Sequence, residues 1–527
     1  MPSSYLRRLS LPLSFPQRTV ALLRCVLAGC SGILVLLFLQ SAYRRIRYPY
    51  VLEWIEEGNL QEVARYVHHL PVYIAPSIEY TANIYAPLYF WVSSWFARWM
   101  GVSFASMRIV SFISTLGLLC GMAALVWQEL PRKSAARALS TVFAVGLFLS
   151  LYPISTAFFD LGRVDMLCMF FTVFALLAGR RDQPILAGLL WILAFHTKQG
   201  MLPVALLALC YQWQQPRRVF IGLFTFGAGA GASVAWLAYI QPFWYWRMVF
   251  RTAGNFPFIP RQISGLLPQD LFEPLGIAIL ILLASVLLTP PNWRSTTVSF
   301  YGFSAVGMVF FSCYLRVHGG ASNNAMIPAW VWISIVSAIG FGRLYSFLQR
   351  RSFTPGLVLL LGAAVIQLVS HVYNPGTYVP PASEAKLRRD FLDQIRSIPG
   401  DVLIFDHPQY SVLAGKRPYA AGEVVETILV SKNKQDGERV QAEFAAKIHQ
   451  RVFTAIAIDM NSEDAWAQHW IPGDFLRYYP VRVVATGGER RELTPQPLFI
   501  YFPCPSRTTP DPRQLLPQAL IDDSLCH

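Results

Sequence analysis

Long apolar blocks alternate with short polar segments along most of the chain. Examples are 25–39, 139–153, 219–240, 275–288 and 356–369, most of which end close to a charged residue or a proline. Continuous apolar stretches repeated in this way are typical of transmembrane helices rather than of strands in a water-soluble core. The pattern predicts an α-helical, multi-pass membrane protein with about eleven spans in residues 1–371.

The tail, residues 372–527, has a different pattern. Segment 386–395 is charged with a helical period, and 401–405 and 454–458 have the apolar pattern of short strands. A helical pattern at 439–451 lies between those strands. This alternation predicts a small soluble α/β domain that follows the last span.

Composition supports the membrane assignment, and the distribution of charge gives it an orientation. Of 527 residues, 54% are hydrophobic and 14% are charged, with a formal net charge of +14. Alternate short loops carry Arg132 and Arg137, Arg180 and Arg181, Arg217 and Arg218, and Arg343 and Arg350. By the positive-inside rule these loops are cytoplasmic. The protein is then expected in a cytoplasmic (inner) membrane with its N-terminus on the cytoplasmic side and its tail in the periplasm or outside the cell.

That distribution also explains the excess of positive charge without a nucleic-acid partner. Three basic residues just after the first span run against the rule, namely Arg44, Arg45 and Arg47.

Some residues have no predicted chemical role. Six of the eight cysteines lie in apolar blocks, as buried small side chains do, and only Cys504 and Cys526 of the tail are candidates for a disulfide. Glu62 and Glu129 are assigned to the solvated surface.

The first outer loop, residues 44–103, is long and contains four prolines. Loops of this length are more often functional than merely connecting. Residues 53–66 carry acidic and then apolar positions at helical spacing, which predicts an amphipathic helix lying along the membrane surface. A dense run of aromatic residues then extends from Tyr85 and Tyr89 to Trp99, and it suits either a membrane interface or a platform for a sugar.

Three turns next to apolar blocks carry charged or amide side chains. They are Phe159–Asp165, His196–Gln199 and Arg316–Asn324. An ionisable residue at membrane depth is costly, so each turn is a functional hypothesis. With the orientation given above, all three turns open on the same outer face as the first loop.

Cations and carboxylates are therefore predicted to meet on that face. Arg163, Lys198 and Arg316 suit a phosphate or diphosphate, because arginine offers a two-pronged fork and lysine a point charge. A carboxylate opposite them can act as a general base on a hydroxyl or amine. The first loop supplies Glu53, Glu56, Glu57 and Glu79.

Each of these features also has a plainer explanation. Arg163 can pair with Asp165 or Asp160, and Lys198 can extend to the membrane surface. Gly319-Gly320 fits a tight turn, and Asn323-Asn324 fits a helix cap. The carboxylates of the first loop could bind a divalent metal ion, but histidines and carboxylates do not have the spacing of a known metal site, and no other cofactor is indicated.

The chain resembles the GT-C type of polyprenyl-phosphate-dependent glycosyltransferases, the superfamily of protein O-mannosyltransferases and aminoarabinose transferases, and especially its bacterial members. The segments that carry the resemblance are, in chain order, Glu53–Gly58, Ile84–Tyr89, Ser106–Ser111, Gly162–Asp165, Thr197–Gln199 and Gly319–Asn324. In the tail, Leu413–Pro418 resembles the outer domains of the family.

The resemblance implies transfer of a sugar from a polyprenyl-phosphate donor to a glycan, lipid or protein acceptor on the outer face of the membrane. It also implies that an acidic residue of the first loop is the base. Glu56 occupies the matching position, with Glu57 beside it and Glu53 still in contention.

The candidate site follows from these considerations. The donor-binding candidates are Arg163, Asp165, Lys198, Gln199, Arg316, Tyr85 and Tyr89, and the acceptor or loop contacts are Gly319, Gly320, Asn323, Asn324 and Glu79. A secondary transporter or lipid flippase is the alternative class, since it also combines many spans with buried charges. Transporters usually contain internal repeats and midplane sites, whereas the polar motifs here cluster towards one face.

Overall fold

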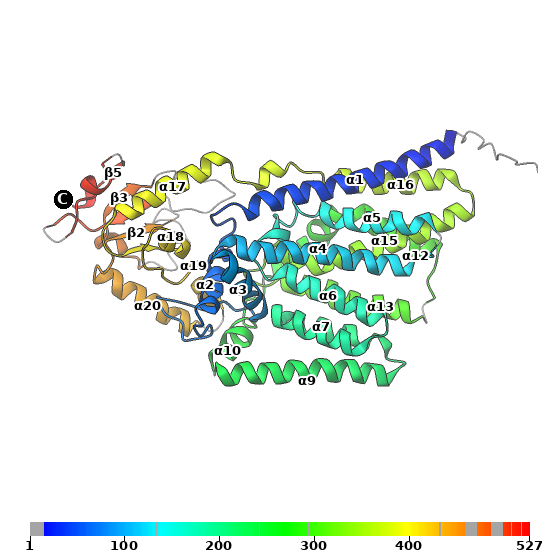
Figure 1. Cartoon of the computed structure of the whole chain (residues 1–527), viewed down its shortest axis with the longest axis horizontal. Helices are drawn as coiled ribbons and strands as arrows, with labels where there is room; N and C mark the ends of the chain where they lie inside the picture. Colours follow the sequence, from blue (N-terminus) through cyan, green and yellow to red (C-terminus); the bar gives the residue numbers. More distant parts are fainter. Residues whose placement is uncertain are drawn as a thin grey trace, which may run out of the picture.

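The chain forms a bundle of long helices with a small α/β domain at one end (Figure 1). The computed structural model describes residues 15–132, 134–241, 243–292, 295–431, 434–458, 472–485, 499–506, 509–517 and 519–526. The bundle helices are α1 (Phe15–Ile46), α4 (Phe104–Glu129), α5 (Ala135–Ser150), α6 (Asp165–Arg180), α7 (Pro184–Thr197), α8 (Leu202–Leu209), α9 (Pro216–Ile240), α12 (Glu273–Leu288), α13 (Thr296–Ala305), α14 (Phe311–Arg316), α15 (Ile327–Arg350) and α16 (Thr354–Val369). Two short helices, α10 (Trp244–Trp246) and α11 (Ile263–Gly265), lie in a connection at the domain end of the bundle.

Six segments within the described residues are long and apolar enough to cross a membrane. They are Gln17–Ile46, Phe104–Glu129, Pro216–Ile240, Pro260–Leu288, Thr296–Arg316 and Asn323–Arg350. Shorter apolar helical segments are Ala135–Ser150, Pro184–Thr197, Gln199–Gln212 and Thr354–Val369. The multi-pass helical architecture is confirmed, and the number of spans stays a prediction.

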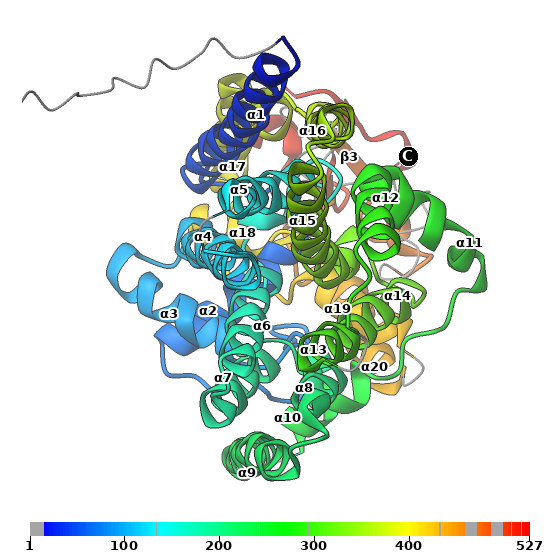
Figure 2. The same cartoon turned by 90° about the vertical axis from the view of Figure 1, so that its right-hand side faces the viewer.

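The packing order of the bundle brings distant parts of the sequence together. Helix α1 packs against α5 and α16, α4 packs against α5 and α6, and α7 lies between α6 and α9. Viewed from the end remote from the α/β domain, α15 lies inside the bundle and α9 at its edge (Figure 2). Because α15 is almost entirely covered by its neighbours, its small and apolar side chains form part of the central core.

The first loop folds into two helices, α2 (Ile55–Val67) and α3 (Leu88–Met100). The predicted helix is present as α2, but its acidic face is buried against neighbouring protein instead of facing water. That α2 lies along the membrane surface stays a prediction. Helix α2 packs against α3 and against α18 (Pro408–Leu413) and α19 (Gly422–Val430) of the tail. Helix α3 exposes Trp91, Trp95 and Trp99 along one side, as helices at a membrane interface do.

The tail contains the predicted mixture of helices and strands. Its remaining elements are α17 (Ala382–Ser397), α20 (Gln435–His449), α22 (Pro512–Leu515), β1 (Val402–Ile404), β2 (Ala455–Ile458), β3 (Val481–Val484), β4 (Phe499–Phe502) and β5 (Ile521–Asp522). The strands form one sheet in the order β1-β2-β4-β3-β5, in which β1 and β2 are parallel and the other pairs antiparallel. The four predicted elements of the tail are therefore confirmed as α17, β1, α20 and β2.

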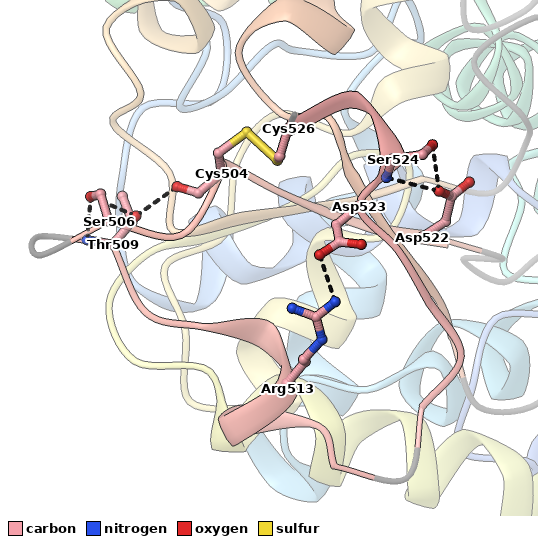
Figure 3. Close-up of a disulfide and its surroundings, with 8 residues drawn as sticks. All are labelled: Cys504, Ser506, Thr509, Arg513, Asp522, Asp523, Ser524 and Cys526. Atoms are coloured by element: carbon pink, nitrogen blue, oxygen red, sulfur yellow. Dashed lines mark hydrogen bonds and ion pairs between the residues drawn. A yellow bond between two sulfur atoms is a disulfide. The ribbon is translucent and has the colours of Figure 1, made fainter.

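A disulfide joins Cys504 to Cys526 and ties the end of the chain to the segment after β4 (Figure 3). Arg513 and Asp523 form an ion pair at 2.6 Å beside it. The cystine therefore links the segment after the inner strand β4 to the segment after the edge strand β5.

Two charged residues of the bundle are more buried than their sequence context suggests. The sequence places Glu129 on the solvated surface, but its side chain is 7% exposed and accepts a hydrogen bond from Arg180 at 2.6 Å. Arg45, which runs against the positive-inside rule, is buried and pairs with Asp160 at 2.9 Å. Neither residue contributes a free charge to the surface.

Arg108, on α4, connects the first loop to the bundle. Its guanidinium donates to both carboxylate oxygens of Glu56, at 2.9 and 2.6 Å. Its other three N–H groups donate to the carbonyls of Arg45, Tyr48 and Tyr50, at 3.0, 2.7 and 2.8 Å. All five donors are used, and neither side chain of the ion pair is exposed. Arg108 therefore fixes the path of the chain as it leaves α1.

Replacing this arginine should destabilise the protein strongly. We expect Arg108→Ala to cost about 3–5 kcal/mol, because the substitution leaves the Glu56 carboxylate buried without its counter-charge. The measurement is thermal denaturation of the purified protein in detergent. Arg180→Ala is the comparison: its guanidinium is one-quarter exposed, so its loss should cost clearly less, and equal losses would contradict the special position of Arg108.

Candidate functional site

The turn before α6 is held in place by the first loop. The N–H of Gly162 donates to Glu56 Oε1 at 2.8 Å, and the Gly162 carbonyl accepts from Asn59 Nδ2 at 2.8 Å. A side chain at this position would meet Glu56 and Met107 at about 3.0 Å, so glycine permits the close approach. The N–H and the carbonyl of Gly162 are both held by hydrogen bonds, and the next residue is Arg163.

A row of charged side chains begins at Arg163 and crosses between helices. Arg163 Nη1 lies 2.9 Å from Glu53 Oε1, and its Nε lies 3.5 Å from Asp165 Oδ2. Asp165 Oδ1 accepts from Lys198 Nζ at 2.7 Å, and both Asp165 oxygens lie 3.3 Å from Asn324 Nδ2. The first loop and all three polar turns therefore meet at the domain end of the bundle, as the sequence predicts.

The ends of this row remain accessible while its centre is buried. The side chains of Glu53 and Lys198 are 13% and 18% exposed, compared with 5% for Arg163 and 4% for Asp165. Glu53, which can accept a proton, and Lys198, which is a cation, are therefore partly exposed at opposite ends of the buried pair Arg163 and Asp165. This arrangement suits a reaction that needs a base at one point and a cation at another.

A small cavity adjoins the Lys198 end of the row. Its polar wall contains Asp165, Lys198 and Asn324. Its apolar wall contains Met169, Met201, Phe311, Leu315, Ile327 and Pro328. Its lining combines a cation with apolar side chains, and as it stands the space admits little more than a water molecule.

The three first-loop carboxylates have different surroundings. Glu56 has no exposed surface, and its oxygens accept hydrogen bonds from Arg108, Gly162 and Leu52. Burial alone would raise the pKa of Glu56, but the Arg108 guanidinium and these hydrogen bonds lower it below its usual value. Glu56 is therefore a firmly ionised anchor whose hydrogen-bonding positions are filled.

Glu57 faces the tail domain instead. Its Oε2 accepts from the N–H of Gln409 at 3.0 Å, and its Oε1 lies 3.3 Å from His407 Nδ1. Burial raises the pKa of Glu57, although the contacts with His407 and Gln409 oppose that shift. This carboxyl group connects domains and does not join the charged row.

Glu53 differs from both neighbours because its side chain is partly exposed, at 13%. Apart from Arg163, the contact of its carboxylate is the N–H of Ile55, at 3.2 Å from Oε2. Burial raises the pKa of Glu53 above its usual value, and Arg163 opposes that change. A raised pKa brings a carboxylate closer to the range in which it is an effective proton acceptor.

The other donor-side candidates lie close to the row but have distinct contacts. Gln199 Nε2 donates to the carbonyls of Ile84 and Val249, both at 2.7 Å, so it holds the first loop against the bundle. Tyr89 is buried and donates to the carbonyl of Met107 at 3.0 Å. Tyr85 is half-buried, and its carbonyl accepts a hydrogen bond from the Tyr73 hydroxyl at 2.7 Å.

The third turn contributes one residue to the row, Asn324. Its neighbour Asn323 donates to the carbonyl of Ile154 at 2.9 Å. Gly319 donates to the carbonyl of Pro257 at 2.8 Å, and Gly320 adopts a φ of +77° in the turn.

Two further candidates have partners outside the charged row. Arg316 Nε lies 3.1 Å from Asp270 Oδ2. Glu79 pairs with Arg417 at 3.2 Å and with Lys447 at 3.0 Å, both in the tail domain. The structure therefore does not bring Arg316 or Glu79 to Arg163 and Lys198.

Sequence reasoning assigned no role to two residues that shape the site, Arg108 and Asn59. Arg108 lies among the segments that carry the family resemblance, and an arginine within an apolar helix is itself a signal of a buried partner. Asn59 gave no comparable signal, because a single amide on a helix is ordinary. Among the described residues, no group of three or more histidine, cysteine, aspartate or glutamate side chains is arranged to hold a metal ion.

Comparisons with known proteins show what the chain is similar to. Residues 83–282 match the model of glycosyltransferase family 87. Two solved structures of ArnT from Cupriavidus metallidurans have a similar fold. The apo structure has 13% sequence identity and a TM-score of 0.57, covering 90% of this chain and 97% of that chain.

The second ArnT structure is bound to undecaprenyl phosphate, and it has 13% identity and a TM-score of 0.53, covering 77% of this chain and 89% of that chain. No curated protein matches the sequence. The predicted resemblance to GT-C type membrane glycosyltransferases is confirmed by the family match and by the fold.

Glu62 corrects a second surface assignment. It has no exposed surface, and its Oε1 accepts a hydrogen bond from the N–H of Asn83, next to the start of the family match. Burial raises the pKa of Glu62 to about 8, with the Asn83 contact opposing the shift. The sequence places Glu62 on the solvated surface because helical spacing does not show which neighbour covers a polar face.

This raised pKa predicts a pH-dependent gain from Glu62→Gln. Folding keeps the carboxyl protonated, so its stabilising contribution is complete below the unfolded pKa of about 4.5 and is lost as pH rises towards 8. The glutamine variant, which mimics the protonated acid, should match the parent near pH 4.5. At pH 9 it should be more stable by a few kcal/mol. Melting temperatures across this range test the sign, and a constant difference would contradict it.

Proposed function

We propose that this protein transfers a sugar from a polyprenyl-phosphate donor to an acceptor hydroxyl or amine by an inverting displacement. The observation that carries the proposal is the row Glu53, Arg163, Asp165 and Lys198, which has an accessible base at one end and an accessible cation at the other. The solved ArnT chain with this fold binds undecaprenyl phosphate, which supports a lipid-linked donor.

The cavity beside Lys198 is the proposed place of the donor phosphate. Once widened by the donor, it would present Lys198 to the phosphate and its apolar wall to the first part of the prenyl chain, with Arg163 next along the charged row. Lys198 Nζ donates to Asp165 Oδ1 at 2.7 Å, and Asn324 Nδ2 lies 3.3 Å from the same oxygen, so Asp165 holds Lys198 and is itself held by Asn324. The lipid can enter such a site from the membrane without leaving an apolar environment.

Glu53 is the proposed general base. Glu56 is the sequence-based choice, but its oxygens already accept bonds from Arg108 and two backbone N–H groups. Glu57 is 1% exposed and engages the tail domain. Glu53 alone among the three combines partial exposure with a position on the charged row.

The proposed reaction balances in one displacement. Glu53 accepts the proton of the acceptor hydroxyl or amine while the acceptor atom bonds to the anomeric carbon. The bond between that carbon and the phosphate oxygen breaks, and the electron pair leaves with the lipid phosphate. Arg163 and Lys198 stabilise the negative charge that develops on the phosphate. This charge grows as the bond breaks, so the stabilisation is stronger in the transition state than in the bound donor and accelerates the reaction.

A transporter or flippase would use the same charges differently. Such proteins bind their cargo near the membrane midplane. Here the row includes Glu53 of the first loop, and the helix that follows Glu53, α2, packs against the tail domain. The position favours chemistry at a membrane face over passage through the bundle.

We further propose that this face is the outer one and that the tail is periplasmic or extracellular. The Cys504–Cys526 disulfide supports this orientation, because cystines persist in oxidising compartments. Arg217 and Arg218 stand in the first turn of α9 and Arg350 in the last turn of α15, at helix ends remote from the tail, as expected for cytoplasmic loops.

The base assignment predicts a separation of catalysis from binding. Glu53→Gln should lower sugar transfer by about 10²–10⁴-fold, because it removes the proton acceptor at nearly constant volume. Its affinity for undecaprenyl phosphate should remain. Lys198→Ala should instead weaken that affinity. Product formation from prenyl-phosphate sugars and titration with undecaprenyl phosphate are the two measurements.

Asp393→Asn, which changes an exposed ion pair on α17, controls for expression and purification. Full transfer activity in Glu53→Gln would remove Glu53 from the mechanism. Unchanged lipid-phosphate affinity in Lys198→Ala would remove the proposed donor site.

The orientation predicts the accessibility of single thiols. The background for both tests replaces the six unpaired cysteines by alanine. In that background, Cys504→Ala deprives Cys526 of its disulfide partner, and Cys526 should react with a membrane-impermeant maleimide on intact spheroplasts. A cysteine placed at Gln215, an exposed residue between α8 and α9, should react only after the membrane is permeabilised. The reverse labelling pattern would place the tail in the cytoplasm.

A further inference from the structure

Helix α2 has two polar sides, and one of them holds the charged row. Glu56 and Asn59 fix the Gly162 peptide, each at 2.8 Å. Glu53 lies in the turn that starts the helix, where its carbonyl accepts from the N–H of Glu56 at 3.0 Å. A displacement of α2 would therefore move Glu53 and Arg163 relative to each other.

The other side of α2 docks onto the tail domain. Gln61 Nε2 donates to the carbonyl of Tyr419 at 2.6 Å, and Gln61 Oε1 accepts from the N–H of Ala421 at 3.1 Å. The N–H of Gly58 donates to Glu423 Oε1 at 2.7 Å. The Tyr419 carbonyl, the Ala421 N–H and the buried Glu423 side chain of the tail thus fix the position of α2.

Gly58 shows how closely the two domains meet. A methyl group at this position would clash with Val424 and would lie 2.6 Å from Glu423 Oε1. Glycine is unfavourable inside a helix, so its presence here fits a demand for close backbone contact. The contact with Glu423 is direct and leaves no room for a bridging water.

The two sides alternate along a single stretch of helix. Glu56 and Asn59 contact the site, whereas Gly58 and Gln61 contact the tail. One turn of a hydrogen-bonded helix is stiff, and its packed faces allow few alternative positions. Tail contacts and site contacts are therefore mechanically connected within about two turns of helix.

We propose that α2 couples the docking of the tail domain to the geometry of the Glu53–Arg163 pair, and that Glu423 and Gln61 are positioning residues for sugar transfer. This inference rests on the proposed function for its catalytic readout. Neither residue touches the charged row, so their effect must pass through α2. The tail domain then acts as a structural part of the active site and not only as an appended module.

Glu423 offers a matched pair of variants. Glu423→Ala removes the acceptor for the Gly58 N–H, whereas Glu423→Gln keeps a carbonyl oxygen of the same reach. Burial raises the pKa of Glu423 well above its usual value. Glutamine keeps the shape of this side chain and a carbonyl oxygen for the Gly58 N–H. Gln61→Met tests the docking from the α2 side. Methionine has a similar volume but cannot make the hydrogen bonds of Gln61 with Tyr419 and Ala421.

Asp436→Asn is the control for tail docking in general. Asp436, on α20, pairs with Arg247 of the bundle, so this contact joins the same two domains without involving α2. The proposal requires Glu423→Ala and Gln61→Met to behave alike and Asp436→Asn to behave like the parent.

The experiment combines kinetics with hydrogen exchange on the full-length protein in lipid nanodiscs. Glu423→Ala and Gln61→Met should lower kcat by about tenfold or more, since small displacements of catalytic groups have effects of that size. The KM for the donor should change by less than about twofold, because the cavity beside Lys198 is untouched. Amide exchange of peptides containing Gly162 should become faster in both variants, and Glu423→Gln should restore both properties.

The outcomes separate this inference from the proposed function. If the parent transfers no sugar, the proposed function fails, and exchange at Gly162 still reports whether α2 couples the domains. Unchanged exchange at Gly162 in both α2-contact variants overturns the coupling. An equal response in Asp436→Asn also overturns it, because the effect would then come from general undocking of the tail.

Discussion

The buried ion pair between Arg108 and Glu56 is the interaction on which the rest of the site depends. Arg108 uses five donors to bind Glu56 and three carbonyls at the end of α1, so the first loop can follow only one path. Glu56 in turn accepts from Gly162, which precedes Arg163. One guanidinium thus connects α1, α4, α2 and the turn before α6. Breaking it would leave a buried charge as well as a displaced loop.

The chemistry of the site follows from which groups this anchor leaves available. Glu56 is held in its ionised form by Arg108 and cannot easily exchange a proton. Glu53, three residues earlier, projects to the edge of the same structure and has a raised pKa because it is largely buried. Two carboxylates of one short segment therefore have opposite roles, one structural and one suited to proton transfer, because of their immediate surroundings.

Sequence reasoning recovered the parts of the site that consist of charges within apolar blocks. The predicted meeting of charged and amide side chains occurs at Arg163, Asp165, Lys198 and Asn324. Polar groups at membrane depth are costly unless they pair with one another. The tail elements were also predictable from periodicity. The choice among Glu53, Glu56 and Glu57 was not, because consecutive helical positions point in different directions and only the packed neighbours distinguish them. Tertiary cover likewise decided the burial of the acidic side of α2.

The charged row is electrically balanced, and this balance shapes the proposed transfer. Glu53 and Asp165 offset Arg163 and Lys198 in the described structure. When Glu53 accepts a proton it loses its negative charge, while the departing lipid phosphate gains one. Arg163 lies between these two positions, so its favourable partner changes from Glu53 to the phosphate as the reaction proceeds. The net charge of the site stays constant through the displacement, and the fixed guanidinium stabilises the negative charge as it moves from base to leaving group.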